Sequence, residues 1–214
     1  MGTGGTSPRE RYRAQVHAEI KQHAWEQVAT TGVSALSLNA IAKRMGMSGP
    51  ALYRYFASRD ELLTELIRDA YRSLADAVLA AADSGAGVAG LAHVVRDWAL
   101  ADPQRYFLLY GTPVPGYHAP EDTAKITSEM MAVLIEAHTA ALSAEAPATP
   151  FDAHLGEHRH WADDSAPTAA LRKSLAFWTR VHGVVSLELA GHFNGMGFDP
   201  ALLFQQELDE LLAH

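Results

Sequence analysis

The segment Ser37–Leu63, with the sequence SLNAIAKRMGMSGPALYRYFASRDELL, contains two short runs of apolar periodicity separated by Gly-Met-Ser. Ser37 can cap the first run as a helix, and Gly46 can end it, because glycine readily adopts the left-handed conformation common at helix C-termini. Ser48 can cap the second run, whose first turn tolerates proline because an N–H at that place has no intrahelical partner. Two helices joined by a three-residue turn that contains glycine form a helix-turn-helix, which is predicted here for residues 37–56.

The second helix of this motif is expected to have one buried face and one free face. Leu52 and Phe56 are four residues apart and are predicted to pack against the apolar face of the first helix. The free face starts with small residues and continues with polar or aromatic ones: Gly49, Pro50, Tyr53 and Arg54, with Tyr55 at its flank. A short helix can enter the DNA major groove end-on when its first residues are small and its outer face is polar.

Several of these side chains have groups that suit nucleic acid. The hydroxyls of Tyr53 and Tyr55 can reach phosphates, and Arg54 can bond a guanine edge or a phosphate. Arg59 can hold a further phosphate, and Ser37 can offer both its hydroxyl and a helix N-terminus to the DNA backbone. The alternative is that the segment is simply a pair of packed helices with half-buried tyrosines.

The charge of the chain is distributed unevenly along its 214 residues. Residues 1–60 contain eight Lys and Arg against four Asp and Glu, a balance of +4, whereas the remaining residues have nine basic and 21 acidic side chains, a balance of −12. A basic N-terminal segment on an otherwise acidic chain indicates an anionic partner for that segment alone. Local fluctuation of surface charge is the alternative.

Apolar residues recur at helical spacing along nearly the whole chain, and neither a strand of consequence nor an internal repeat is indicated. Ser58 and Glu61 have the S-x-x-E spacing of a capping box, which predicts the start of a long helix. The stretches DSGAGVAG near residues 83–90 and GTPVPGY at residues 111–117 predict breaks between helices. The other helices are predicted at residues 9–30, up to Leu100, 106–110, 121–142, 168–194 and 201–214, with a loop or loosely ordered connection at 144–167.

The composition excludes several classes of protein. The chain has no cysteine, which excludes disulfides, Cys-ligated zinc and thiol nucleophiles and fits a reducing cytoplasm. No apolar run approaches the roughly 20 residues of a membrane helix. The first residues lack the apolar core of a signal peptide, and residues 1–8 are expected to be a flexible tail. Phosphate-loop, serine-hydrolase, dinucleotide and zinc-protease motifs are missing, so an enzyme is not expected.

Residues 9–70 resemble the DNA-binding domain of TetR/AcrR-type transcriptional regulators. The resemblance depends on LYRYF followed by SRDELL, which is close to the family pattern L-Y-x-[HY]-F-x-[ST]-[KR]-x-x-L-[LI]. It implies an all-α fold in which an N-terminal three-helix DNA-binding domain is followed, over residues 71–214, by a helical domain that binds an effector and dimerises.

The resemblance also implies which residues contact DNA. Base or groove contacts are implied for Asn39, Gly49, Pro50, Tyr53 and Arg54. Phosphate contacts are implied for Ser37, Tyr55 and Arg59. Relatives have a larger polar side chain at the position of Gly49, which argues against direct base reading by this residue.

The predicted helix at 168–194 is apolar over so much of its circumference that it is expected to be buried on two sides. Its two apolar stripes are Leu171, Leu175, Trp178, His182, Val185 and Leu189, and Phe177, Val181 and Val184. Together with residues 201–214 it can form a four-helix interface between two chains. A twofold dimer would present two recognition helices about 34–36 Å apart to a palindrome. The alternative is that these helices close the core of a monomer.

A small-molecule effector is expected between the helices of the second domain, and no other cofactor. The candidate contacts are Trp98, Tyr106, Phe107, Tyr110, Met130, Met131, Leu134, Phe177, Trp178 and His182. Aromatic and Met residues at helical spacing also form ordinary cores, so the alternative is plain packing. The segment Trp178–Gly183, WTRVHG, resembles a subgroup of TetR-like C-terminal domains with a Trp-x-x-x-His-Gly signature.

The segment AHLGEHRHW contains a group of histidines. His154 and His158 are four residues apart, with Glu157 and His160 beside them, and on a helix they could bind a metal ion. The neighbouring sequence is rich in proline, which favours a solvated, His-rich linker. No metal site is therefore predicted.

These features together predict a cytoplasmic transcriptional regulator, most readily a repressor, that binds a palindromic operator as a dimer and is released by a small-molecule effector. The alternative is a helical ligand-binding or metal-binding protein of the same fold that binds no operator.

Overall fold

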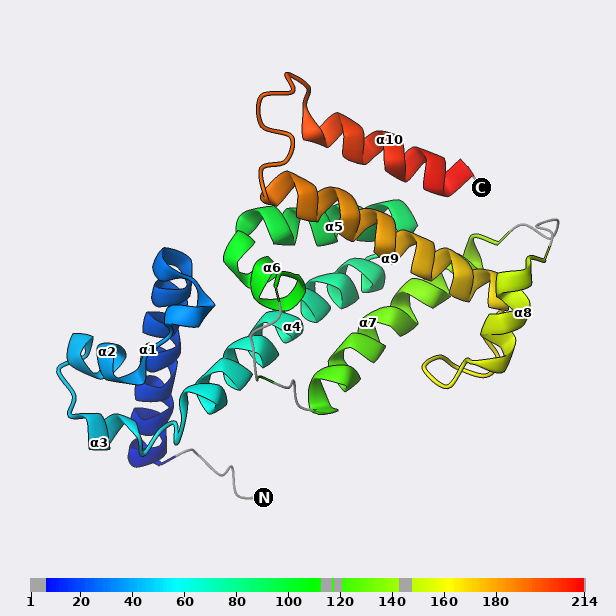
Figure 1. The fold of residues 1–214 in the computed structure, drawn as a ribbon. Coiled ribbons are helices and arrows are strands. Elements are labelled where there is room, and N and C mark those ends of the chain that lie inside the picture. The colour runs from blue at the N-terminus through cyan, green and yellow to red at the C-terminus, as the bar shows by residue number, and fades with distance from the viewer. Residues whose placement is uncertain (1–6, 113–116, 118–120, 143–147, 214) are drawn as a thin grey trace. The chain divides into compact units, whose positions relative to one another are not determined.

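The structure, a computed structural model, describes residues 7–112, 117, 121–142 and 148–213, apart from the side chains of residues 121 and 122. All regular structure in these ranges is helical, which confirms the predicted all-α class. The elements in Figure 1 are α1 (Pro8–Thr31), the 3-10 turn η1 (Val33–Ala35), α2 (Leu38–Arg44), α3 (Gly49–Leu52), α4 (Arg59–Asp83), α5 (Val88–Ala101), α6 (Pro103–Tyr110), α7 (Glu121–Ala140), α8 (Pro150–Glu157), α9 (Thr168–Leu189) and α10 (Pro200–Ala213). Within the described ranges, no helix combines the length and apolarity needed to cross a membrane.

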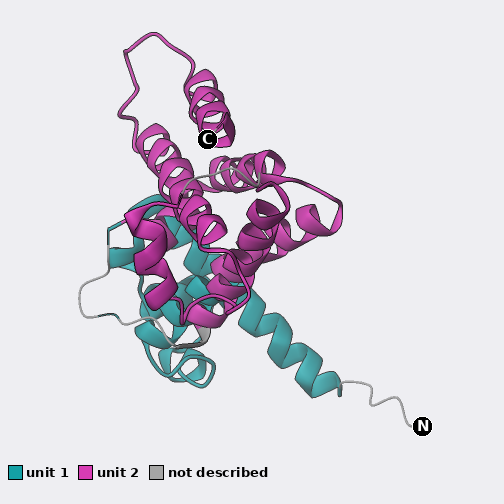
Figure 2. Cartoon of the chain, turned by 90° about the vertical axis from the view of Figure 1, so that its right-hand side faces the viewer, with its two compact units in different colours: residues 1–69, 112–119 teal, residues 70–111, 120–214 magenta. Residues whose placement is uncertain are grey.

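The chain forms two compact units, which Figure 2 shows in different colours. Unit 1 contains residues 1–69 and 112–119, and unit 2 contains residues 70–111 and 120–214. The chain passes from unit 1 to unit 2 within α4, so this one helix belongs to both units.

Unit 1 is built on α1, which buries every fourth residue of one face: Val16, Ile20, Ala24 and Val28. The helix begins with a reciprocal cap, in which Ser7 Oγ accepts from the Glu10 N–H (3.2 Å) and the Glu10 carboxylate accepts from the Ser7 N–H (2.7 Å). The tail predicted for residues 1–8 was wrong at its end, because Pro8 is already helical and Ser7 caps the helix. Residues 1–6 lie outside the described residues.

The helix-turn-helix segment follows the prediction in its packing and departs from it in detail. Gly46 has a φ of +65°, the left-handed conformation expected at the end of the first helix. Leu52 and Phe56 are buried, as predicted. Ser48 lies at the N-cap of α3, but its side chain makes no capping hydrogen bond, contrary to prediction. The helix itself ends at Leu52, because a turn begins at the next residue.

The core of unit 2 surrounds α9, and Arg96 of α5 contacts both α9 and α10. Arg96 of α5 binds Glu188 of α9 through two hydrogen bonds (2.7 and 3.2 Å). The same guanidinium lies 5.3 Å from the ring centroid of Phe204 in α10. The buried side chains of this core include Leu74, Leu91, Tyr106, Met130, Leu134, Phe177, Val185, Phe204 and Leu208.

Two expectations about unit 2 were wrong. The helix predicted to run to residue 194 ends at Leu189, because Gly191 takes a φ of +76° directly after it. The loop predicted at residues 144–167 contains α8, which starts with a reciprocal cap between Thr149 and Asp152. The turn predicted at 111–117 lies largely outside the described residues.

Helix α8 is held to α9 by a buried carboxylate. Asp152 accepts hydrogen bonds from the Thr149 N–H (2.7 Å) and from Arg172 Nε (3.0 Å). Burial acts to raise the pKa of Asp152, but the hydrogen bonds from Thr149 and Arg172 outweigh it, so the pKa lies below its usual value. The ionised carboxylate therefore stabilises the folded state.

We expect Asp152→Asn to lower the free energy of unfolding at pH 7 by about 1–3 kcal/mol, because Arg172 and Thr149 lose a charged acceptor. A lowered pKa stabilises the fold above the unfolded pKa of about 4, and that contribution is lost as the pH falls further. The difference between variant and parent should therefore shrink below pH 4. Urea unfolding followed by circular dichroism at pH 7 and pH 3 measures it, and an equal loss at both pH values would contradict the role of the carboxylate.

Candidate nucleic-acid interface

The start of α2 is fixed by two hydrogen bonds at Ser37. Its Oγ accepts from the Ala40 N–H (3.3 Å), which is the predicted cap. Its own backbone N–H donates to Gln27 Oε1 on α1 (3.0 Å). The first residue of the helix-turn-helix is thus tied both to α2 and to the helix that supports it.

Asn39 of α2 and Gly49 of α3, both predicted to contact DNA, lie side by side. A Cβ added to Gly49 would be 3.6 Å from Asn39 Oδ1, an ordinary van der Waals contact. The φ of Gly49 is not positive, so its backbone conformation is open to other residues. Neither the backbone nor the packing of the described residues therefore requires glycine here. The missing side chain leaves the start of α3 open beside Asn39, with Pro50 exposed next to it.

The residues predicted on the outer face of the second helix lie at its end and in the turn beyond it. Tyr53 is the C-cap of α3 and is 45% exposed. Arg54 and Tyr55 follow in the turn, where the Tyr55 N–H donates to the Leu52 carbonyl oxygen (2.8 Å). Arg54 is exposed and Tyr55 is half-buried. The residues predicted to form one face of a helix therefore lie partly in a short helix and partly in the turn that follows it.

Two of these residues share a groove with the first turns of α1. Arg54 and Tyr55 line a cavity of about 300 Å³ together with Arg9, Tyr12 and Arg13, and we call these five residues the arginine patch. Its three arginines are exposed, and no described acidic residue forms an ion pair with them. Sequence reasoning missed the α1 residues as site residues, although the basic excess in residues 1–60 had pointed to this segment.

Two other cations of unit 1 form ion pairs with carboxylates of the same unit. Lys21 pairs with Asp69 (2.7 Å), and Arg44 of α2 pairs with Glu26 of α1 (2.8 Å). Glu26 also bonds His23 Nδ1 (3.1 Å), and this contact is the largest cause of its lowered pKa. Arg11 and Lys43 are also exposed, and no described acidic residue pairs with them, so the positive charge available to an anion lies on these two residues and on the arginine patch.

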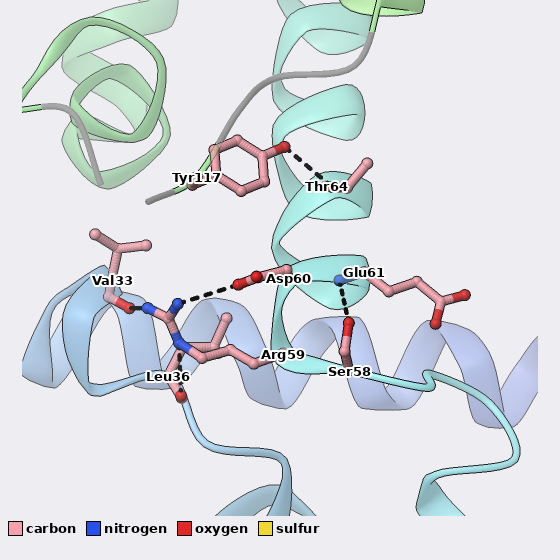
Figure 3. A network of polar contacts seen from close by, with 8 residues as sticks. All are labelled: Val33, Leu36, Ser58, Arg59, Asp60, Glu61, Thr64 and Tyr117. Carbon is pink, nitrogen blue, oxygen red and sulfur yellow. Dashed lines mark hydrogen bonds and ion pairs between the residues drawn. The ribbon is translucent and has the colours of Figure 1, made fainter. Parts of the chain in front are cut away.

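Arg59, predicted to hold a phosphate, is directed into unit 1 (Figure 3). Its Nη2 donates to the Val33 carbonyl oxygen (2.9 Å) and its Nε to the Leu36 carbonyl oxygen (3.2 Å). Its Nη1 lies 3.5 Å from Asp60 Oδ1. Arg59 therefore joins the start of α4 to the segment directly before α2, and contact with phosphate stays a prediction.

The start of α4 has further hydrogen bonds, of which Figure 3 shows Ser58–Glu61 and Thr64–Tyr117. The Glu61 N–H donates to Ser58 Oγ (3.0 Å), which is one half of the predicted capping box. The Glu61 carboxylate accepts from the Ala57 N–H rather than from that of Ser58. One turn later, the hydroxyls of Thr64 and Tyr117 are 3.0 Å apart.

In unit 2, the residues predicted to bind an effector fall into two groups. Tyr110, Trp178 and Met131 line a cavity of about 390 Å³ with Tyr71, Thr127, Ser128 and Trp161, which sequence reasoning did not select. Tyr106, Met130, Leu134 and Phe177 are buried in the core and line none of the described cavities. Phe107 and Trp98 pack against that core, and Trp98 Nε1 donates to Ser73 Oγ (3.1 Å).

The remaining candidate, His182, lies beside the cavity residues. Its ring centroid is 4.2 Å from that of Tyr110 and 4.3 Å from that of Trp178. Burial lowers its pKa to about 4, so the ring is neutral at pH 7.

The histidines of the α8 segment stack on one another. The ring centroids of His154 and His158 are 4.2 Å apart, and His158 Nδ1 lies 3.0 Å from the His154 carbonyl oxygen. Among the described residues, no three His, Asp or Glu side chains are grouped so as to hold a metal ion.

A helix-turn-helix unit joined to a second helical unit is the architecture of a DNA-binding transcriptional regulator. Residues 20–66 match the family described as bacterial regulatory proteins, tetR family. Residues 88–211 match the tetracyclin repressor-like C-terminal domain. The chain belongs to the TetR family of transcriptional regulators, which are not enzymes.

Relatives support this assignment over nearly the whole length of the chain. The HTH-type transcriptional regulators Rv1816 of Mycobacterium tuberculosis and Mb1846 of Mycobacterium bovis are each 35% identical to it, over 94% of this chain and 92% of theirs. The crystal structure of the regulatory protein SCO4313 is 67% identical, with a TM-score of 0.90 over 97% of this chain and 100% of that one. The repressor NalD of Pseudomonas aeruginosa shares the fold at 16% identity, with a TM-score of 0.54 over 95% of this chain and 96% of its own.

The contacts of Arg59 predict how its substitution affects unit 1. We expect Arg59→Ala to lower the free energy of unfolding by about 2 kcal/mol, because two carbonyl groups lose a charged donor. Arg59→Lys keeps the charge but loses the planar fork, so it should also destabilise the unit. Thermal unfolding of both variants measures the effect. Full stability of Arg59→Ala would show that the two bonds contribute nothing.

Proposed function

We propose that this protein is a repressor that binds a palindromic operator as a homodimer and is released from DNA by a small-molecule effector. In this proposal, residues 9–70 bind DNA, residues 71–214 bind the effector and dimerise, no other cofactor is needed, and the protein acts in the cytoplasm. The observation that carries the proposal is the open surface of α2 and α3 beside the unpaired arginine patch.

The proposed DNA contacts divide by chemistry. Groove and base contacts come from Asn39, Gly49, Pro50, Tyr53 and Arg54. Phosphate contacts come from Ser37, Tyr55 and Arg59, to which we add the Arg9 and Arg13 side chains of the arginine patch. Phosphate contacts position the protein, and the groove contacts provide sequence preference.

The proposed dimer uses α9 and α10. Apolar side chains at the C-terminal part of α9 and beyond it are exposed: Leu187, Met196, Phe198, Leu202 and Leu212. The most exposed of them, Leu202, is 71% accessible on α10. A second copy of the chain would cover these side chains and complete a four-helix interface.

The proposed switch uses α4, which begins in unit 1 and ends in unit 2. An effector that favours one arrangement of unit 2 can change the position of the DNA-binding unit through this helix. A coupling of about 1–3 kcal/mol is enough for a useful response. We also propose that Trp178, His182 and Gly183 mark a subgroup of the family. The second candidate is a protein of the same fold that binds a ligand or a metal ion and does not bind an operator.

The proposal is tested by selection from random DNA duplexes with purified protein at near-physiological salt, followed by sequencing. Enrichment of a palindrome with half-sites one helical turn apart is the expected result. Recovery of single, unpaired half-sites would contradict the dimer. Failure to enrich any sequence, both with protein as purified and after denaturation and refolding to remove bound molecules, would favour the second candidate.

Gly49 permits a sharp test of close DNA approach. Gly49→Ala adds one methyl group that the unit accommodates, so the melting temperature should stay the same or rise. If DNA approaches the start of α3 closely, the selected palindrome should bind at least tenfold more weakly. Fluorescence anisotropy measures the affinity, and Gly87→Ala at the N-cap of α5, where an added Cβ meets nothing within 4 Å, is the control outside the DNA-binding unit. Unchanged affinity of Gly49→Ala would exclude close approach.

A further inference from the structure

The centre of unit 2 contains a hydrogen-bonded group built around Tyr106. Its hydroxyl is 2.6 Å from Ser186 Oγ and 3.1 Å from His182 Nδ1, and it donates to the His182 carbonyl oxygen (3.2 Å). The phenol has a single proton, so when it donates to the carbonyl oxygen, His182 Nδ1 donates to the phenol oxygen and is the protonated ring nitrogen. The other ring nitrogen, Nε2, is then an acceptor in need of a donor.

Two polar atoms beside this group have no partner in the described part of the chain. His182 Nε2 and the Tyr110 hydroxyl are both buried, and neither makes a hydrogen bond. Their rings are packed together, with centroids 4.2 Å apart. Burial, with the nearby phenols of Tyr71 and Tyr106, raises the pKa of Tyr110, so its hydroxyl keeps its proton. Unpartnered buried polar groups destabilise a fold, and folding of this chain alone gives no reason for two of them.

One of the two residues, Tyr110, adjoins empty space, and His182 packs against two residues of its lining. Tyr110 and Trp178 line the cavity of about 390 Å³, a size typical of small-molecule sites. Its walls are aromatic or apolar, apart from the aliphatic hydroxyls of Thr127 and Ser128 and the phenol hydroxyls of Tyr71 and Tyr110, and none of the described residues that line it is charged. A second cavity, of about 780 Å³ along α7, shares Ser128 and Trp161 with it, so the two adjoin.

We propose that this cavity binds an uncharged, largely apolar molecule that carries a hydroxyl group. A hydroxyl both donates and accepts, so a group of this kind can donate to His182 Nε2 or accept from the Tyr110 O–H. The aromatic walls suit the apolar remainder of the molecule. The role of this ligand as the effector rests on the proposed function. Its binding to the cavity does not depend on that function.

Charged ligands fit this place poorly. An anion would find no described cation among the lining residues, and a cation would find no carboxylate there. The acidic side chains nearby, Glu136 and Asp163, line the second cavity. The Asp163 carboxylate already accepts from the Ser165 N–H (2.7 Å) and bonds its hydroxyl, and Glu136 is exposed.

The test compares three probes with the same chain length: 1-octanol, octanoate and octyltrimethylammonium. Binding to the full protein, without DNA, is followed by tryptophan fluorescence, because Trp161 and Trp178 line the cavity. We expect saturable binding of 1-octanol that is at least tenfold tighter than that of either ion. Equal or tighter binding of a charged probe, or no saturable binding of 1-octanol, would overturn the proposal.

Two tyrosine variants separate ligand binding from structure. Tyr110→Phe removes an unpartnered hydroxyl, so it should raise the melting temperature of the free protein and weaken 1-octanol binding about fivefold, the equivalent of one hydrogen bond. Tyr106→Phe removes a hydroxyl that has three partners, so it should lower the melting temperature. Unchanged 1-octanol affinity in Tyr110→Phe would contradict the assigned hydroxyl contact.

The outcome is independent of DNA. Protein that binds 1-octanol as described but enriches no duplex would contradict the proposed function and support the ligand class. Protein that enriches a palindrome but does not bind 1-octanol would support the proposed function and contradict the ligand class.

Discussion

The hydrogen bonds of one guanidinium close the helix-turn-helix into a defined unit. Arg59 follows the segment from Ser37 to Ser58, and it binds the carbonyl oxygens of Val33 and Leu36 directly before that segment. The two ends of the helix-turn-helix are thus joined through one side chain. Helix α3 has only four residues, too few for stability on its own, so it depends on this closure and on buried Leu52 and Phe56.

This closure changes which cations can meet DNA. An arginine whose Nε and Nη2 serve internal carbonyls has only part of its fork left for phosphate. Arg44 and Lys21 are similarly paired with carboxylates. The unpaired arginines at the start of α1 and in the turn after α3 line one groove. Long-range attraction of DNA to an acidic protein therefore depends on that patch more than on the start of α4.

Local rules explain what the sequence could predict. The α2 and α3 boundaries follow from Ser37, Gly46 and the spacing of apolar residues, all of which act within a few positions. Helix α8 was missed although Thr149 and Asp152 form a local cap three residues apart; its other tie, Arg172, lies twenty residues beyond Asp152. Periodicity identified the buried face of α9, but it could not show where packing leaves space. Tyr106 and Phe177 therefore proved to be core, whereas Trp161, in a predicted loop, lines both cavities.

Each unit contains one feature that its own folding does not explain. In unit 1, Gly49 begins a helix at a place where the backbone and the neighbouring Asn39 would accept alanine, a better helix former. In unit 2, the Tyr110 hydroxyl and His182 Nε2 are buried and have no hydrogen-bond partner among the residues that the structure describes. A sequence selected for stability alone would have alanine at the first place and phenylalanine at Tyr110. Departures of this kind are expected where a surface serves a partner, and here they fall on the predicted DNA-binding helix and on the wall of a cavity.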